Sequence, residues 1–266
     1  MKAKRLGVVG VGTLGEALVR GFRARWPELP IAGSVRQQAS LARRAGCGAE
    51  LSRDAAAAVR GCDVVILAVK PQVMPQVLRL VRPALEPGAL VISVAAGVTT
   101  DRIEAELGPV PVVRVMPNTP CLLGEGMSVL SAGAHAGPEH MELAQALFDA
   151  VGQTAVLEEG LMNAVTGLSG SGPAYVYLVI ESLAEAGVKV GIPRATSTRL
   201  AAQTVLGAAR MVLELGEHPA LLKDAVTTPA GCTVDGLMEL EEGGLRVTLL
   251  KAVVRATERA RELEPE

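Results

Sequence analysis

The chain is 266 residues long, and with 49% hydrophobic and 20% charged residues it can bury a full core, which argues against disorder. A formal net charge of −2, with one Trp, two Tyr and two Phe, argues against a nucleic-acid partner, since neither a basic surface nor rings for base stacking are indicated. No apolar run reaches the ~18 residues that span a bilayer, so no membrane partner is expected.

Cysteine and histidine spacing gives no sign of a metal site. The four cysteines are far apart and form no Cys-x-x-Cys pair, so neither a metal centre nor a disulfide framework is predicted. Residues 1–5 lead directly into the first apolar run, so no targeting segment is expected there. A reducing cytoplasm is therefore the expected location. His135, His140 and His218 lie in polar contexts without ligand spacing and are expected at the surface.

The first predicted strand, residues 6–9, runs into the glycine pattern G-x-G-x-x-G. Gly10 permits a tight turn, Gly12 lets the backbone approach a pyrophosphate, and Gly15 lets the following helix pack on the strand. Thr13 and Leu14 open that helix, whose free amides and positive dipole end attract phosphate. The pattern predicts a dinucleotide-binding turn, with an ordinary glycine turn as the alternative.

Further along, strands and helices alternate up to about residue 157. Near-continuous apolar runs predict strands at 31–34, 64–69, 90–94, 110–115, 127–130 and 154–157, and helical spacing predicts helices at 37–45, 54–59, 101–107 and 138–151. This alternation is typical of an α/β, doubly wound, Rossmann-like sheet.

Beyond about residue 160 only helical spacing is found, so a dinucleotide-binding domain (1–159) and an all-helical domain (160–266) are predicted. The predicted helices are 174–190, 194–215, 220–226, 234–241 and 245–263. The first of them is apolar around most of its circumference and must be covered on all sides. Either a subunit interface or a central position within one chain would cover it.

The cofactor type is indicated by the end of the second strand. NAD-binding units usually carry an acidic residue there for the ribose 2′-hydroxyl, whereas this chain has Ser34 and Arg36. A hydroxyl and a guanidinium suit a 2′-phosphate, so NADP(H) is favoured and NAD(H) stays open. The alternative for Arg36 is a solvated charge at the start of the next helix.

Other loops leave the carboxyl ends of predicted strands, where ligands bind in open α/β sheets. They are Val69-Lys70-Pro71, Ala95-Ala96-Gly97 and the loop that contains Asn118. Each could be an ordinary turn, but together with the glycine pattern they outline one side of a cofactor cleft.

The helical half has two small-residue loops, 167–175 and 227–233. The second precedes a helix, and bare amides at a helix start suit a carboxylate. Thr233 could either cap that helix or donate its hydroxyl to a substrate.

These residues resemble the pyrroline-5-carboxylate reductase family in order from residue 5 to about residue 263. The motifs that carry the resemblance are Gly10-x-Gly12-x-x-Gly15, Val69-Lys70-Pro71, Ser93 to Gly97, Arg114 to Pro120, Gly124 to Gly126, Leu168 to Tyr175 and Pro229 to Gly236. The two motifs of the helical half are more specific than the glycine turn.

The resemblance implies hydride transfer from NAD(P)H to the C=N carbon of 1-pyrroline-5-carboxylate, giving L-proline. It also implies an all-helical dimerisation domain, a homodimer and further assembly, commonly into decamers. The backbone amides around Gly231, Cys232 and Thr233 would hold the substrate carboxylate, and Ser171 would also bind the substrate. The Thr233 hydroxyl would hydrogen-bond the ring nitrogen and act in catalysis. No metal is implied.

The loop 229–233 departs from the family pattern, which usually reads Pro-Gly-Gly-Thr-Thr or Pro-Gly-Gly-Ala-Thr. Ala230 would be strained if its position needs a positive φ. Cys232 is expected to be a small packed thiol rather than a nucleophile. Ala55 stands where the family often has an asparagine near the adenosine, so that contact is absent from the expected site.

Two alternative functions stay open for these residues. One is a reductase of a related cyclic imine or of a β-hydroxyacid. The β-hydroxyacid type would need a lysine in the helical half for proton transfer, and neither Lys189 nor Lys223 lies in a matching motif. The other is a nucleotide-binding regulatory protein without turnover, which the intact small-residue loops and Thr233 disfavour.

Overall fold

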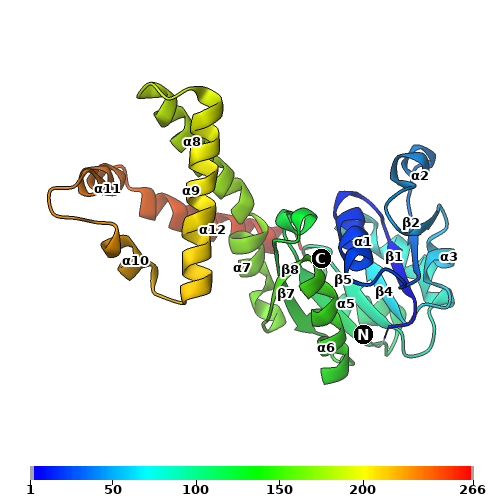
Figure 1. Cartoon of the computed structure of the whole chain (residues 1–266). Helices are drawn as coiled ribbons and strands as arrows, with labels where there is room; N and C mark the ends of the chain where they lie inside the picture. The colour runs from blue at the N-terminus through cyan, green and yellow to red at the C-terminus, as the bar shows by residue number, and fades with distance from the viewer. Residues whose placement is uncertain (1–2, 265–266) are drawn as a thin grey trace. The chain divides into compact units, whose positions relative to one another are not determined.

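A single sheet organises the N-terminal half of the protein (Figure 1). In the computed structural model, which describes residues 3–264, eight strands are ordered β3-β2-β1-β4-β5-β6-β7-β8. They are β1 (Leu6–Val9), β2 (Ile31–Ser34), β3 (Glu50–Ser52), β4 (Val64–Leu67), β5 (Leu90–Ser93), β6 (Val112–Met116), β7 (Gly126–Ala132) and β8 (Gly152–Val156). All neighbours are parallel except β6 and β7. The doubly wound sheet that the alternation predicts is confirmed.

Helices cover both faces of this sheet because its central strands are apolar on both sides. Strands β1, β4 and β5 are buried along their whole length. On one face, α1 (Thr13–Arg25) and α6 (Pro138–Phe148) meet through an edge-to-face contact of Phe22 with Phe148, whose ring centroids are 6.3 Å apart. On the other face lie α3 (Ala55–Val59), α4 (Met74–Val81) and α5 (Thr100–Leu107).

Short elements complete the loops around the sheet. They are α2 (Gln38–Arg44) and the 3₁₀ turns η1 (Pro71–Val73), η2 (Arg82–Ala84), η3 (Thr119–Leu123), η4 (Asp149–Val151) and η5 (Glu159–Leu161). The predicted domain boundary after residue 159 falls at the first residue of η5, and it stays a prediction.

The first small-residue stretch is helical, so the predicted loop at 167–175 is wrong. Helix α7 (Met162–Val165) continues into a π-helical turn, η6 (Thr166–Gly170), and then into α8 (Gly172–Lys189). The amide of Ser171 donates to the Thr166 carbonyl at 2.9 Å, five residues back. Glycines at 167, 170 and 172 keep side chains out of this wide turn, which a sequence pattern registers as a loop.

The chain forms two compact units, one that runs to Ser171 and takes in the segment from Arg255 onward, and one that spans Gly172–Val254. The second unit is built from α8, α9 (Arg194–Leu215), α10 (Pro219–Ala225), α11 (Cys232–Glu242) and the first half of α12 (Leu245–Glu262). Helices α8 and α9 are joined by Ser197, whose buried hydroxyl donates to the Ala184 carbonyl at 2.6 Å.

Candidate functional site

The glycine turn is fixed by hydrogen bonds to the end of β2. The amides of Gly10 and Val11 both donate to the Ser34 carbonyl, at 3.1 and 2.8 Å. Gly10 has a φ of 95°, and a Cβ there would lie 2.6 Å from the Ala68 carbonyl oxygen. A Cβ at Gly15 would lie 2.5 Å from the Gly10 carbonyl oxygen, so both positions need glycine for packing.

Gly12 differs from its two neighbours. A Cβ there would meet only the Gly10 carbonyl oxygen, at 4.0 Å, and Gly12 borders a cavity. The missing side chain therefore leaves space beside the backbone for a bound molecule rather than for another part of the chain. Gly12 also caps α1, whose first residues Thr13 and Leu14 present amides without carbonyl partners inside the helix. These features fit the pyrophosphate of a dinucleotide.

The cavity beside this turn has a volume of about 310 Å³ and lies within the first unit. It is lined by Gly10, Val11, Gly12, Val35, Arg36, Gln37, Ser40, Arg44, Ala68, Val69, Lys70 and Val73. Among these lining residues three are cationic and none is acidic, so the cavity suits a polyanion. The structure thus brings together five of the predicted cofactor residues: Gly10, Gly12, Arg36, Val69 and Lys70.

Several lining residues lie outside the sequence prediction, above all Gln37, Ser40 and Arg44. Their spacing of three and then four residues places them on one face of the short α2 and its approach. That periodicity, read from the end of β2, is the signal that could have identified them.

Ser34 is placed differently from its predicted role. It is 5% exposed, and its carbonyl rather than its hydroxyl anchors the glycine turn. It is absent from the residues that line the cavity. Pro71 begins η1 and lines a second cavity, of about 400 Å³, together with Val98 and Leu263.

The Ala95-Ala96-Gly97 loop follows β5, with Ala96 exposed and its two neighbours buried. The Ala95 amide donates to the Ser93 hydroxyl at 3.4 Å. Gly97 has a φ of 72°, and a Cβ there would lie 3.6 Å from the Leu263 carbonyl oxygen, so the C-terminal segment packs closely over this loop.

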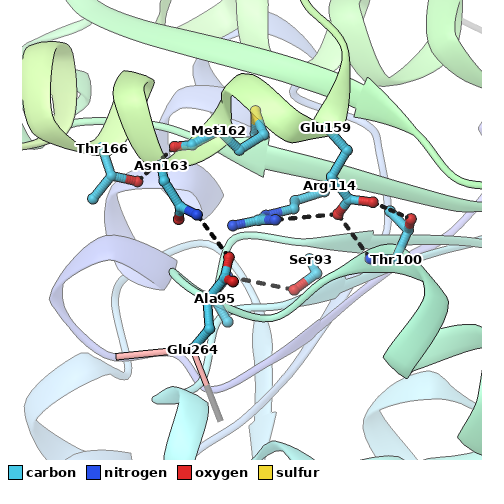
Figure 2. A network of polar contacts seen from close by, with 9 residues as sticks. All are labelled: Ser93, Ala95, Thr100, Arg114, Glu159, Met162, Asn163, Thr166 and Glu264. Carbon is cyan, nitrogen blue, oxygen red and sulfur yellow. Dashed lines mark hydrogen bonds and ion pairs between the residues drawn. The ribbon is translucent and has the colours of Figure 1, made fainter. Parts of the chain in front are cut away.

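A polar network holds the segment after that loop (Figure 2). Glu159 accepts from the Thr100 amide at 2.8 Å, from the Thr100 hydroxyl at 2.6 Å and from the Arg114 guanidinium at 3.2 Å. Arg114 projects from β6 and is only 3% exposed, so its charge is balanced inside the protein. Nearby, Asn163 donates to Glu264 at 2.8 Å.

Asn118 contributes to the frame through both ends of its side-chain amide. Its oxygen accepts from the Met127 amide at 2.8 Å, and its nitrogen donates to the Ser169 carbonyl at 3.1 Å. Asn118 therefore ties the loop after β6 to the π-helical turn, and its cofactor role stays a prediction.

The second site is the start of α11. Gly231 caps the helix, its amide donates to the Thr228 carbonyl at 3.0 Å, and Cys232 is the first helical residue. Thr233 is the second residue of the helix, so of the two roles open to it the cap is wrong. Its amide and that of Cys232 lie in the first turn, where no carbonyl of the helix can accept from them.

Two departures from the family pattern have structural outcomes. Ala230 has a φ of 56°, the only positive value at a non-glycine residue among residues 3–264, which confirms the expected strain. Cys232 is exposed rather than packed, so that expectation is wrong for the single chain. Ala55 begins α3 behind its cap, Asp54, and Ser171 lies in the first unit at the end of the π-helical turn.

The histidines have structural partners. His140 and His218 each use Nδ1 to accept a backbone amide at a helix start, from Gly137 at 3.0 Å and from Ala220 at 3.2 Å. His135 is exposed and lies 3.3 Å from Glu104. Within residues 3–264, no cluster of three or more His, Cys, Asp or Glu side chains could hold a metal ion, and no helix has the length and hydropathy needed to cross a membrane.

Comparison with known proteins covers the whole chain. Residues 159–263 match the family model for pyrroline-5-carboxylate reductase dimerisation, and residues 5–97 match the model described as NADP oxidoreductase, coenzyme F420-dependent. A pyrroline-5-carboxylate reductase of Methanosarcina acetivorans is 44% identical over 99% of both chains. One of Glycine max is also 44% identical, over 97% of this chain and 95% of that one.

Solved structures give the same result. A pyrroline-5-carboxylate reductase from Coxiella burnetii covers 100% of both chains with a TM-score of 0.93 and 35% identity. A Plasmodium falciparum pyrroline carboxylate reductase with NADP bound covers 100% of both chains with a TM-score of 0.88 and 31% identity. The chain carries the family's dimerisation domain and belongs to the pyrroline-5-carboxylate reductase family.

Proposed function

We propose that this protein reduces the C=N bond of 1-pyrroline-5-carboxylate to the CH–NH of L-proline, the last step of proline synthesis. The observation that carries the proposal is the 44% identity, over 99% of both chains, to the pyrroline-5-carboxylate reductase of Methanosarcina acetivorans. Two sites support the proposal, since the reaction needs one for each reactant. The cavity beside Gly12 suits the cofactor, and the start of α11 at Gly231 suits the substrate.

We propose NADP(H) as the preferred cofactor, with NAD(H) as a weaker substitute. The lining of the cavity supports this choice, because it includes Arg36 and Lys70 and no carboxylate that would hold a ribose 2′-hydroxyl. The relative from Plasmodium falciparum contains NADP. Gly10, Gly12 and the first amides of α1 would hold the pyrophosphate, and Arg36 the 2′-phosphate.

The bound nicotinamide would supply the hydride, and the protein's own part is to bind and orient the substrate. The imine nitrogen of the substrate is basic, and its protonated form is already a good hydride acceptor. No strong enzymatic acid is then required. The amides of Cys232 and Thr233 would hold the carboxylate at the positive end of α11, and the Thr233 hydroxyl would hydrogen-bond the ring nitrogen.

We further propose that the working form is a homodimer built on the second unit, with assembly into decamers as the larger possibility that the family suggests. Exposed apolar side chains on α8 and α9, including Tyr177, Leu178 and Leu213, support a partner surface there. A cytoplasmic location is proposed from cysteine usage alone.

A reductase of the six-membered imine analogue is the alternative, because one methylene changes binding by only ~1–3 kcal/mol. The decisive experiment follows oxidation of NADPH, and then of NADH, by the purified protein with each ring size, and identifies the product. Rapid formation of proline with NADPH supports the proposal. Turnover of the six-membered imine alone would support the alternative, and tight NADPH binding without turnover of either would contradict both.

A further inference from the structure

A second arginine borders the nucleotide cavity beside Arg36. Arg44 ends α2, and its side chain is 11% exposed. It lines the same cavity as Arg36 and Ser40. Its Nη1 donates to Glu16 in the first turn of α1, the helix that begins at the glycine turn. Arg44 is therefore held in place from the helix that would carry the pyrophosphate.

From this arrangement we infer that Arg44 is a second determinant of the preference for NADP(H) over NAD(H). Arg44 binds the ribose 2′-phosphate together with Arg36 and the Ser40 hydroxyl. The inference rests on the proposed NADP(H) dependence and deepens it. Ser34, the hydroxyl that the sequence suggested for this task, is buried and outside the lining. Ser40 replaces it as the hydroxyl that borders the cavity.

The chemistry of the guanidinium supports this assignment. Arginine has five N–H donors in a planar fork, so the bond to Glu16 leaves other donors for a phosphate. A phosphate accepts several charge-assisted hydrogen bonds, whereas a ribose 2′-hydroxyl carries no charge to attract the guanidinium. The two arginines therefore strengthen NADP(H) binding far more than NAD(H) binding.

Arg20 provides the contrast that separates this role from a structural one. It donates to the same Glu16 carboxylate, at 2.8 Å, but its side chain is 59% exposed and it does not line the cavity. An effect of Arg44 that came only from its ion pair with Glu16 would be shared by Arg20. An effect on the 2′-phosphate would belong to Arg44 alone.

The test measures binding to the cofactor-free protein by calorimetry. The probes are adenosine 2′,5′-bisphosphate, which carries the 2′-phosphate, and adenosine 5′-monophosphate, which lacks it. Arg44→Gln is expected to weaken the bisphosphate about 10-fold and to leave the monophosphate within about 2-fold, as for one lost charge-assisted hydrogen bond. Arg20→Gln, the matched control, is expected to change neither constant.

Arg44→Lys adds a second variant that keeps the positive charge beside Glu16 but lacks the planar fork. It is expected to fold like the parent and to lose part of the preference for the bisphosphate. The ratio of kcat/KM for NADPH to that for NADH should fall in the same order across the variants.

Other outcomes would overturn the inference. Equal weakening of both probes by Arg44→Gln, or the same loss in Arg20→Gln, would make Arg44 a structural residue. Selectivity lost in Arg36→Ala but kept in Arg44→Gln would refute the role of Arg44 and leave the NADP(H) proposal standing. Equal affinity of the parent protein for both probes would instead refute the NADP(H) proposal itself.

Discussion

At the scale of single residues, Ala230 is the position where the chain stores strain. Its φ of 56° places it in the left-handed region, where Cβ crowds the following carbonyl at a cost of about 1–2 kcal/mol. It directly precedes Gly231, the cap of the helix proposed to bind the substrate carboxylate. Ala230 lies in a tight turn that is closed by a hydrogen bond from the Gly231 amide to the Thr228 carbonyl, at 3.0 Å.

Ala230→Gly is expected to stabilise the protein by about 0.5–1 kcal/mol. Relief of the left-handed strain exceeds the extra backbone entropy that glycine loses on folding. Urea unfolding would measure the change. Ala220→Gly is the matched control, since Ala220 lies in the helix α10 of the same unit. This variant should be less stable than the parent protein because glycine is a poorer helix former than alanine. Equal losses in both variants would show that Ala230 is not strained.

Thr233→Ala should lower kcat/KM for 1-pyrroline-5-carboxylate. The corresponding loss of transition-state stabilisation should be roughly 1–3 kcal/mol, the contribution of one hydrogen bond. The side chain is not the helix cap, so the fold should be little affected. Steady-state kinetics with saturating NADPH would measure the loss, and Thr233→Ser, which keeps a hydroxyl, serves as the control. Unchanged kinetics in Thr233→Ala would exclude a role in substrate binding.

The sequence predicts glycines of this site better than it predicts side chains. Gly10, Gly12 and Gly15 are identified because a tight turn, a close approach and a packed helix each demand glycine. The spacing of Gln37, Ser40 and Arg44 could have indicated which face of α2 borders the cavity, but it could not have indicated the contact of Arg44 with Glu16. Glu16 lies 28 residues away in the sequence, and only the folded α1 and α2 bring the two side chains together. Contacts of that kind leave no local pattern.

At the scale of elements, the buried strands and most helices are predicted well, including the short α2, α3 and α10, whereas the edge strand β3 and the π-helical turn are missed. The strands β1, β4 and β5 stand out as apolar runs, whereas β3 at the sheet edge has three residues, two of them polar. The π-helical turn is missed since glycines and serines there mimic a loop. The Ser169 carbonyl in this turn accepts a hydrogen bond from Asn118 of a distant loop, a contact that no periodicity could reveal.

Glu159→Ala should destabilise the protein by about 2–3 kcal/mol. The variant leaves the buried guanidinium of Arg114 without its carboxylate and removes the acceptor of the Thr100 amide and hydroxyl. Chemical unfolding would measure the loss. Glu158→Ala, at the exposed neighbouring position, should stay within about 0.5 kcal/mol. A comparable loss in both variants would contradict the importance of this network.

The link between α1 and α2 should depend on pH. The hydrogen bond from Arg20, more than the charge of Arg44, lowers the pKa of Glu16 below its ordinary value of 4.5, and partial burial opposes this shift. Because the folded-state pKa is the lower one, the stabilisation is complete above about 4.5 and is lost as the pH falls through the folded-state pKa.

Glu16→Gln is expected to abolish this dependence. The difference in unfolding free energy between the parent and the variant should be largest near pH 7 and should shrink toward pH 3. Denaturant titrations at a series of pH values would measure it. A difference that stays constant over this range would contradict the assignment of the ion pairs to Glu16.

At the scale of the whole molecule, the two units differ in how far their apolar side chains are buried. The first unit buries large clusters on both faces of its sheet. The second unit leaves many apolar side chains exposed in the single chain, among them Tyr177, Leu178, Leu206 and Leu213. The sequence indicates this surface because α8 is apolar around most of its circumference. The sequence alone leaves open whether α8 is covered by the same chain or by a partner subunit.

Leu178→Asp should weaken dimerisation about 100-fold or more, because a charge would be placed where a 64% exposed leucine is proposed to meet the partner. Analytical ultracentrifugation over a range of concentrations would measure the effect. Leu80→Asp, at a 51% exposed leucine of α4 in the first unit, is the matched control and should leave the dimer intact. Dissociation by both substitutions would point to general unfolding rather than to a specific interface.

The first unit is discontinuous in the chain, since the segment from Arg255 onward packs with residues up to Ser171. Leu263 closes over the loop at Gly97, and Glu264 accepts from Asn163. During translation these contacts can form only after residues 172–254 have left the ribosome. The nucleotide-binding unit thus reaches its final packing after the helical unit has been made, so a ribosome stalled within α11 would carry a sheet whose loop at Gly97 is still uncovered.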